Sequence, residues 1–353
     1  MVEGESLIER IKAIHYQPST ISHQRRGVAF FGSPAWAVPV LQALHQHHQV
    51  VLVVTQPDKP AGRGLQLTPC PVAQWAEAQG LRVEKPAKLR KNPDFLALCR
   101  TLNLDVAVTA AYGKILPADL LEVPRFGFLN LHPSDLPKYR GPAPVQWTLI
   151  NGDAETAVCI MQTDLGMDTG PVVAKWRTSV EPDETAVELA GRLRDKGIEL
   201  LIEAIGNLES LNLTPQPSAG THAPMLEKDD GKIVWERTAS EIYNRHRGVQ
   251  PWPGSWFEHQ GKRVKVIRMS RVEKLASPPA AGGGGAGQEP SDNNPVNVQP
   301  AAPSSVVQIL DGLTVATGQG CLALLEVQPE GKKPMSALDW ARGARIQPGN
   351  LLQ

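Results

Sequence analysis

The 353-residue sequence lacks the features that mark secreted, membrane-spanning or metal-binding proteins. No apolar run approaches the roughly 20 residues that cross a bilayer, so no membrane partner is expected. The four cysteines, at positions 70, 99, 159 and 321, form no C-x-x-C pair and lie at no zinc spacing from a histidine. We therefore expect no metal and reduced thiols. Residues 1–26 have no apolar signal core, so we expect a cytoplasmic protein. We expect these residues to form a flexible N-terminal extension.

Net charge excludes a further class of function. Lys and Arg together number 36 and so do Asp and Glu, so the formal net charge is zero. The chain is therefore not a general polyanion binder, and any contact with nucleic acid must come from a local basic patch.

Apolar segments alternate with amphipathic ones through the first part of the chain. Strands are expected at 27–34, 49–58, 104–113 and 126–132, with helical spacing after the first two. This order predicts an α/β fold with a Rossmann-like, mostly parallel sheet, whose ligands sit at the carboxyl ends of the strands. A nicotinamide cofactor is not expected, because Gly32 stands alone before Ser33 and Pro34 and no G-x-G-x-x-G follows.

The remainder of the chain has a different pattern. After a long amphipathic helix at 184–212, short strands with glycine turns predict a small β-barrel. The expected division is a catalytic domain at 27–213, a proline-rich linker at 214–223 and a barrel domain at 224–353. A Gly/Pro/Asn/Ala-rich insert at about 277–305 is expected to be disordered, since it has too few apolar residues to order itself.

Asn130 and His132 are the first candidates for chemistry. They stand two apart on a predicted strand, so their side chains project from the same face. Each alone is more simply a polar group bonded at a strand end, but the rigid Pro-Ser-Asp-Leu-Pro turn that follows favours a site. Asp168 lies in a glycine-bounded loop downstream, and Asp164 is the second choice there.

An amide, an imidazole and a carboxylate together suit attack on a carbonyl. No serine or cysteine sits in a nucleophile elbow. A substrate amine that attacks an acyl carbon directly is therefore the simplest chemistry.

Several motifs carry a resemblance to a known family. NLHPSDLPKYRGPAPVQW (130–147) and MQTDLGMDTGPV (161–172) resemble the N-x-H-x-S-x-L-P-x-[YW]-[RK]-G and D-x-G-x-D-T-G segments of formyltransferases that use 10-formyltetrahydrofolate. QPDKPAGRGLQLTPCPV (56–72), AAYGKILP (110–117) and KKPMSALDWARG (332–343) resemble segments of the branch that acts on methionyl-tRNA. The resemblance covers about residues 27–353 and implies an OB-like C-terminal barrel that binds tRNA.

The resemblance also implies roles for individual residues. The amino group of initiator methionyl-tRNA would attack the formyl carbon of 10-formyltetrahydrofolate, and Asn130 and His132 would stabilise the resulting oxyanion. Asp168 would favour the imidazolium form of His132, hold the ring tautomer and accept the amine proton. The implied folate-binding residues are Ser134, Asp135, Leu136, Pro137, Tyr112, Gly113 and Ile115. The implied tRNA-binding residues are Arg63, Lys59, Lys138, Arg140, Lys262, Arg263, Lys265 and Arg268.

The sequence departs from the family pattern at two positions in the turn. Pro133 and Asp135 stand where many relatives carry glycine and leucine, and Asp135 would bring a carboxylate near the pterin ring. Two alternative functions stay open. One is formyl transfer to a small amine or an amino sugar, and the other is a catalytically silent tRNA-binding protein. We expect a monomer.

Overall fold

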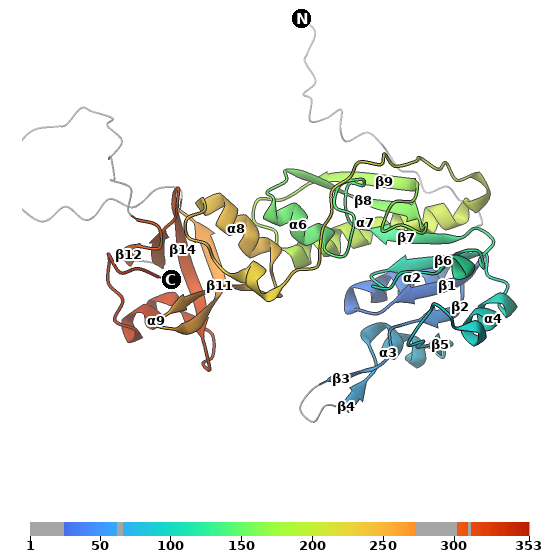
Figure 1. The fold of residues 1–353 in the computed structure, drawn as a ribbon, viewed down its shortest axis with the longest axis horizontal. Coiled ribbons are helices and arrows are strands. Elements are labelled where there is room, and N and C mark those ends of the chain that lie inside the picture. The colour runs from blue at the N-terminus through green and yellow to red at the C-terminus, as the bar shows by residue number, and fades with distance from the viewer. Residues whose placement is uncertain (1–24, 62–65, 273–301, 310–311, 353) are drawn as a thin grey trace, which may run out of the picture.

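The computed structural model describes residues 25–61, 66–272, 302–309 and 312–352 (Figure 1). Three predictions fall on other residues. Arg63, nearly all of the extension at 1–26 and most of the insert at 277–305 lie outside the described residues.

The first half of the molecule is built on a seven-stranded sheet in the order β5-β2-β1-β6-β7-β8-β9. The five strands from β5 to β7 are parallel to their neighbours, whereas β8 and β9 run antiparallel. Their bounds are β1 Gly27–Gly32, β2 Gln49–Val54, β5 Val83–Glu84, β6 Val106–Ala110, β7 Phe128–His132, β8 Glu155–Gln162 and β9 Val172–Ser179. The prediction of a Rossmann-like, mostly parallel sheet is confirmed.

Helices cover both faces of this sheet, which explains why its central strands are apolar at every position. Phe30 of β1 faces a core that includes residues of α2, α3, α6 and α7, while Phe31 faces a core that includes residues of α4 and α5. The helices are α2 Val38–His47, α3 Pro71–Ala78, α4 Pro93–Thr101, α5 Ala118–Leu121, α6 Pro144–Ile150 and α7 Ala186–Gly206, with 3₁₀ turns η1 Ala35–Ala37 and η2 Leu208–Ser210.

Helix α7 fixes the position of the strand that carries Asn130 and His132. It begins at a capping box formed by Thr185 and Glu188. At Gly197 the helix lies so close to the sheet that an added Cβ would be 3.0 Å from carbons of Leu131 and 2.9 Å from a carbon of Val158. The glycine therefore permits close packing of α7 against β7 and β8.

The second half of the molecule is a curled antiparallel sheet in the order β10-β11-β14-β13-β12, with β15 paired to β14. Its strands are β10 Ser255–His259, β11 Lys262–Arg271, β12 Val306–Ile309, β13 Leu313–Ala316, β14 Cys321–Pro329 and β15 Met335–Ser336. Helix α9 (Ala337–Gly343) contributes Trp340 to a core that also contains Phe257 and Leu324. This sheet confirms the predicted small C-terminal β-domain. A separate hairpin, β3 Lys59–Ala61 and β4 Gln66–Thr68, extends from the first half.

Helix α8 (Ala239–Gly248) joins the two halves, and Figure 1 shows it between the C-terminal sheet and α6. An added Cβ at Gly248 would be 2.7 Å from Ile150 Cγ1 and 2.8 Å from the backbone oxygen of Gln146, so the glycine permits close packing of α8 against α6. The buried guanidinium of Arg247 donates to the backbone oxygens of Glu181 and Glu184, which precede α7. None of the helices in the described ranges is both long and apolar enough to cross a membrane.

Candidate active site

Asn130 lies on β7 beside the carboxyl end of β6. Its Oδ1 accepts a hydrogen bond of 2.8 Å from Thr109 Oγ1, and its Nδ2 donates to Asp168 Oδ1 at 3.2 Å. The Thr109 hydroxyl therefore orients the amide so that its N–H groups face the carboxylate. Sequence reasoning missed Thr109. The register pairs it directly with Asn130, but this pairing of parallel strands is decided by the sheet rather than by spacing along the chain.

Asp168 is the centre of the site. Its Oδ2 accepts a hydrogen bond of 2.8 Å from the backbone N–H of Gly141 and lies 3.7 Å from His132 Nδ1. The structure thus brings Asn130, His132 and Asp168 together as expected from their motifs. Asp164, the second choice, accepts only from residues of its own loop and is exposed.

His132 is almost fully buried, and its ring is held from the side opposite Asp168. Nε2 lies 2.9 Å from the backbone oxygen of Tyr139. A carbonyl oxygen only accepts hydrogen bonds, so Nε2 carries the proton in the neutral ring. The role of holding the ring tautomer therefore belongs to Tyr139, not to Asp168 as predicted. Protonation of Nδ1 would place an N–H toward the carboxylate and create an ion pair.

The turn after β7 is fastened by its own side chains. Ser134 is fully buried and its hydroxyl donates to the backbone oxygen of Lys138 at 2.7 Å. This hydroxyl closes the turn, so it is not free for a ligand, contrary to the predicted role of Ser134 in folate binding. Leu136 is buried against Cys159, Met161 and Val172.

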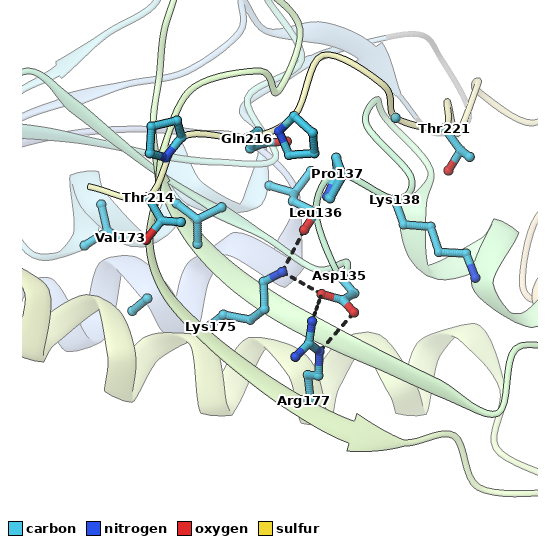
Figure 2. Close-up of a pocket in the computed structure, with 15 residues that line it drawn as sticks. Asp135, Leu136, Pro137, Lys138, Val173, Lys175, Arg177, Thr214, Gln216 and Thr221 are labelled. Carbon is cyan, nitrogen blue, oxygen red and sulfur yellow. Dashed lines mark hydrogen bonds and ion pairs between the residues drawn. The ribbon is translucent and has the colours of Figure 1, made fainter. Parts of the chain in front are cut away.

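A cavity of about 640 Å³ opens beyond this turn, between β9 and the segment at 214–221 (Figure 2). Asp135, Leu136 and Pro137 line it. The Asp135 carboxylate is bound by Lys175 Nζ at 2.6 Å and by Arg177 Nε at 3.1 Å. Burial disfavours ionisation of Asp135, but its bonds to both cations outweigh this and hold its pKa below the usual value. The carboxylate expected near the pterin ring is therefore engaged by β9.

The other predicted folate residues lie elsewhere. Tyr112 is buried in the core, with its ring 5.5 Å from that of Phe31, and its backbone oxygen accepts from Gln56 Nε2 at 2.8 Å. Gly113 adopts a φ of 73°, and Ile115 is 74% exposed. None of these three lines the cavity at Asp135. The predicted folate set thus divides between the carboxyl end of β6 and the turn after β7.

The predicted tRNA-binding cations also differ in accessibility. Lys59 on β3 is exposed, and so is the β11 group of Lys262, Arg263, Lys265 and Arg268. Lys138 forms an ion pair with Asp153 at 2.6 Å. Arg140 is only 6% exposed, and its guanidinium donates to Gln216 Oε1 and to the backbone oxygens of Pro217 and Ser218. This burial removes Arg140 from the residues that can reach a phosphate.

The β11 cations follow an alternating pattern on the C-terminal sheet. Val264 and Val266 point into the core, whereas Arg263 and Lys265 are exposed, as alternation along a strand requires. The Arg263 guanidinium lies 3.8 Å from the centre of the Trp256 ring, and Arg268 is paired in register with Glu326. The stacking holds Arg263 at the surface without neutralising it.

Comparison with known proteins places this arrangement in a family. Residues 26–205 match the family described as Formyl transferase, and residues 225–345 match Formyl transferase, C-terminal domain. A methionyl-tRNA formyltransferase from Thermus thermophilus is 50% identical over 325 residues, which are 92% of this chain and 98% of that protein. A methionyl-tRNA formyltransferase from Deinococcus radiodurans is 47% identical over 323 residues, which are 91% of this chain and 94% of that protein.

Solved structures with the same fold are more distant in sequence. An N-formyltransferase from Helicobacter canadensis, in complex with folinic acid and dTDP-3-aminofucose, aligns with a TM-score of 0.60 at 15% identity, over 85% of this chain and 98% of that chain. HypX from Aquifex aeolicus, in complex with tetrahydrofolic acid, aligns with a TM-score of 0.58 at 12% identity, over 94% of this chain and 51% of that chain. At these identities the likeness concerns the fold alone. The two matched domains and the long, highly identical alignments show that the chain belongs to the methionyl-tRNA formyltransferase family.

Proposed function

We propose that this protein transfers the formyl group of 10-formyltetrahydrofolate to the free amino group of initiator methionyl-tRNA. The proposal rests on one observation: Asn130, His132 and Asp168 lie together in one site. The chain that holds this site is 50% identical to a methionyl-tRNA formyltransferase over 98% of that protein. The product is N-formylmethionyl-tRNA, which serves translation initiation. The folate-bound neighbours support a folate co-substrate.

The chemistry follows from the donors in the site. The amine nitrogen forms a bond to the formyl carbon, and the carbonyl oxygen gains negative charge in the tetrahedral intermediate. The second N–H of Asn130 Nδ2 is the donor for this oxyanion, and the positive charge of a protonated His132 stabilises it. Asp168 stabilises the imidazolium and accepts the amine proton directly or through a water. The intermediate then collapses and the bond to N10 breaks. N10 takes the proton that Asp168 accepted and leaves as tetrahydrofolate.

The substrate-binding residues form a narrower set than the motifs implied. For the folate we propose the carboxyl end of β6, where Gly113 and exposed Ile115 lie, together with the Leu136–Pro137 turn. Ser134 and Tyr112 act by holding the backbone, since their side chains are buried. For tRNA we propose Lys59, Lys138 and the β11 group, because these cations are exposed. Arg63, which lies outside the described residues, stays in the proposed set on the strength of its motif alone.

The domain limits at 27–213, 214–223 and 224–353, a monomeric state and a cytoplasmic location remain predictions. Formylation assays test the function itself. Purified protein is supplied with 10-formyltetrahydrofolate and with charged initiator tRNA, charged elongator tRNA or glycinamide ribonucleotide. We expect formyl transfer to charged initiator tRNA, with little to the other two acceptors. Transfer to the small amine alone would support a small-molecule formyltransferase, and transfer to none would indicate a silent tRNA-binding protein.

A further inference from the structure

The segment between the two sheets is bonded to the loops that carry the active-site residues. We call residues 214–223 the strap, because one end is bonded to the start of β9 and the other to the segment that follows β7. Thr214 exchanges two backbone hydrogen bonds with Val172, and Arg140 exchanges backbone bonds with Thr221 and Ala223. Figure 1 shows this part of the chain running along the first half of the molecule toward α8. The strap is therefore a fixed part of the active-site surroundings.

Gln216 is the strap residue that reaches the site. Its Nε2 donates to the backbone oxygens of Asp168, at 3.0 Å, and Gly170, at 2.7 Å. Its Oε1 accepts from Arg140 Nε at 3.2 Å and Nη2 at 3.0 Å. Arginine has no acceptor and a carbonyl has no donor, so the amide has one possible orientation. All the hydrogen-bonding groups of this side chain are used to connect Arg140 to the loop of Asp168.

The backbone of Asp168 is one that needs such support. Its φ of 53° is in the left-handed region, which few residues other than glycine, asparagine and aspartate adopt. The side chain must nevertheless present both oxygens at once, Oδ1 to Asn130 and Oδ2 to Gly141. Because Gln216 holds the carbonyl of the same residue, it limits rotation of this peptide unit and of the carboxylate attached to it.

We propose that Gln216 is a positioning residue for the transfer reaction, which holds the Asp168 carboxylate in its working place and is itself held by Arg140. This inference rests on the proposed function, in which Asp168 acts on the reacting groups. It assigns Arg140 a role in the active site in place of the predicted contact with tRNA. It also predicts that a residue of the linker changes the chemical step.

The test compares variants of the full-length protein in the initiator-tRNA formylation assay. Gln216→Met keeps the length of the side chain and removes every hydrogen bond. We expect kcat to fall roughly ten- to hundredfold, since small misplacements of a catalytic group cost that much. The KM values for folate and tRNA should change less than about threefold, because the loss concerns the transition state. The matched control is Ser218→Ala, an exposed strap residue whose backbone oxygen still accepts from Arg140.

Two further variants separate positioning from simple bracing of the strap. Gln216→Glu keeps the acceptor for Arg140 but loses both donated bonds, so it should be as slow as Gln216→Met. In an Asp168→Asn background, Gln216→Met should lower kcat by less than about twofold, because residues that act through one another are not additive.

The inference is overturned if Gln216→Met keeps kcat within threefold of the parent. It is also overturned if Gln216→Met lowers kcat by the same factor in the parent protein and in the Asp168→Asn variant. A strap that only braces the fold would lower the melting temperature and leave kcat at 25 °C unchanged. If the parent protein transfers no formyl group, the proposed function fails first and the inference falls with it.

Discussion

Replacement of Asp168 by asparagine removes the charge of the proposed catalytic carboxylate and changes its size very little. In the parent protein both oxygens accept hydrogen bonds, Oδ1 from Asn130 Nδ2 and Oδ2 from the Gly141 N–H. An asparagine at 168 must turn its NH₂ toward one of these donors. Either orientation leaves two donors facing each other, and a lost bond of this kind costs about 1–3 kcal/mol in the free energy of unfolding.

The effect on catalysis should be larger than the effect on stability. The neutral amide no longer stabilises the imidazolium of His132, whose Nδ1 lies 3.7 Å from Oδ2, and no longer accepts the amine proton. Loss of one preorganised group in such a site lowers kcat by about 10²–10³-fold. Because the carboxylate acts on the transition state, kcat and kcat/KM should fall together.

The assay is initial-rate formylation of charged initiator tRNA at saturating folate, with thermal unfolding measured in parallel. Asp164→Asn is the matched control, because Asp164 lies in the same loop, is exposed and bonds only to Gly166 and Thr169. It should keep nearly full kcat. A folded Asp168→Asn protein with kcat within threefold of the parent would refute the assignment. Equal losses in both variants would show that the loop, rather than the carboxylate, controls the rate.

Three further predictions concern packing and pH. Burial lowers the pKa of His246 to about 4 from 6.5, so folding favours the neutral ring. The free energy of unfolding, measured by urea titration, should therefore fall by about 3 kcal/mol as the pH drops from 6.5 to 4. The same measurement on His246→Gln should show a much weaker dependence on pH. Gly197→Ala should lower the free energy of unfolding by about 1–3 kcal/mol, because the added methyl group would press on Leu131. Gly191→Ala should raise the free energy of unfolding, because Gly191 is an open position of the same helix. Equal effects of the two substitutions would contradict the packing argument. Gly141→Ala would place a side chain at a φ of 115°, with its Cβ only 2.8 Å from the backbone oxygen of Ala223 in the strap. The substitution should therefore displace the Gly141 N–H that binds the Asp168 carboxylate, and we expect kcat to fall about tenfold or more. An unchanged kcat would contradict this expectation.

Much of the active site was predictable because its signals are local. Asn130 and His132 share a face through the two-residue period of a strand, and the glycine-bounded loop marks Asp168. Apolar strands alternating with helices likewise predicted the parallel sheet, and short strands with glycine turns predicted the C-terminal β-domain. These features depend on neighbours along the chain, so the sequence contains them directly.

The errors arose where the partner of a side chain lies far along the chain. The sequence predicts a carboxylate near the pterin ring at Asp135, but its ion pairs with Lys175 and Arg177 form only once β9 joins the sheet. Arg140 looked like a surface cation, yet folding buries it beneath the strap. The sequence by itself determined the candidates Asn130, His132 and Asp168, through strand period and turn chemistry, but not Thr109, Tyr139 or Gln216. Only the tertiary structure decided which hydrogen bonds and ion pairs those residues make, because these bonds join segments that the chain does not place next to one another.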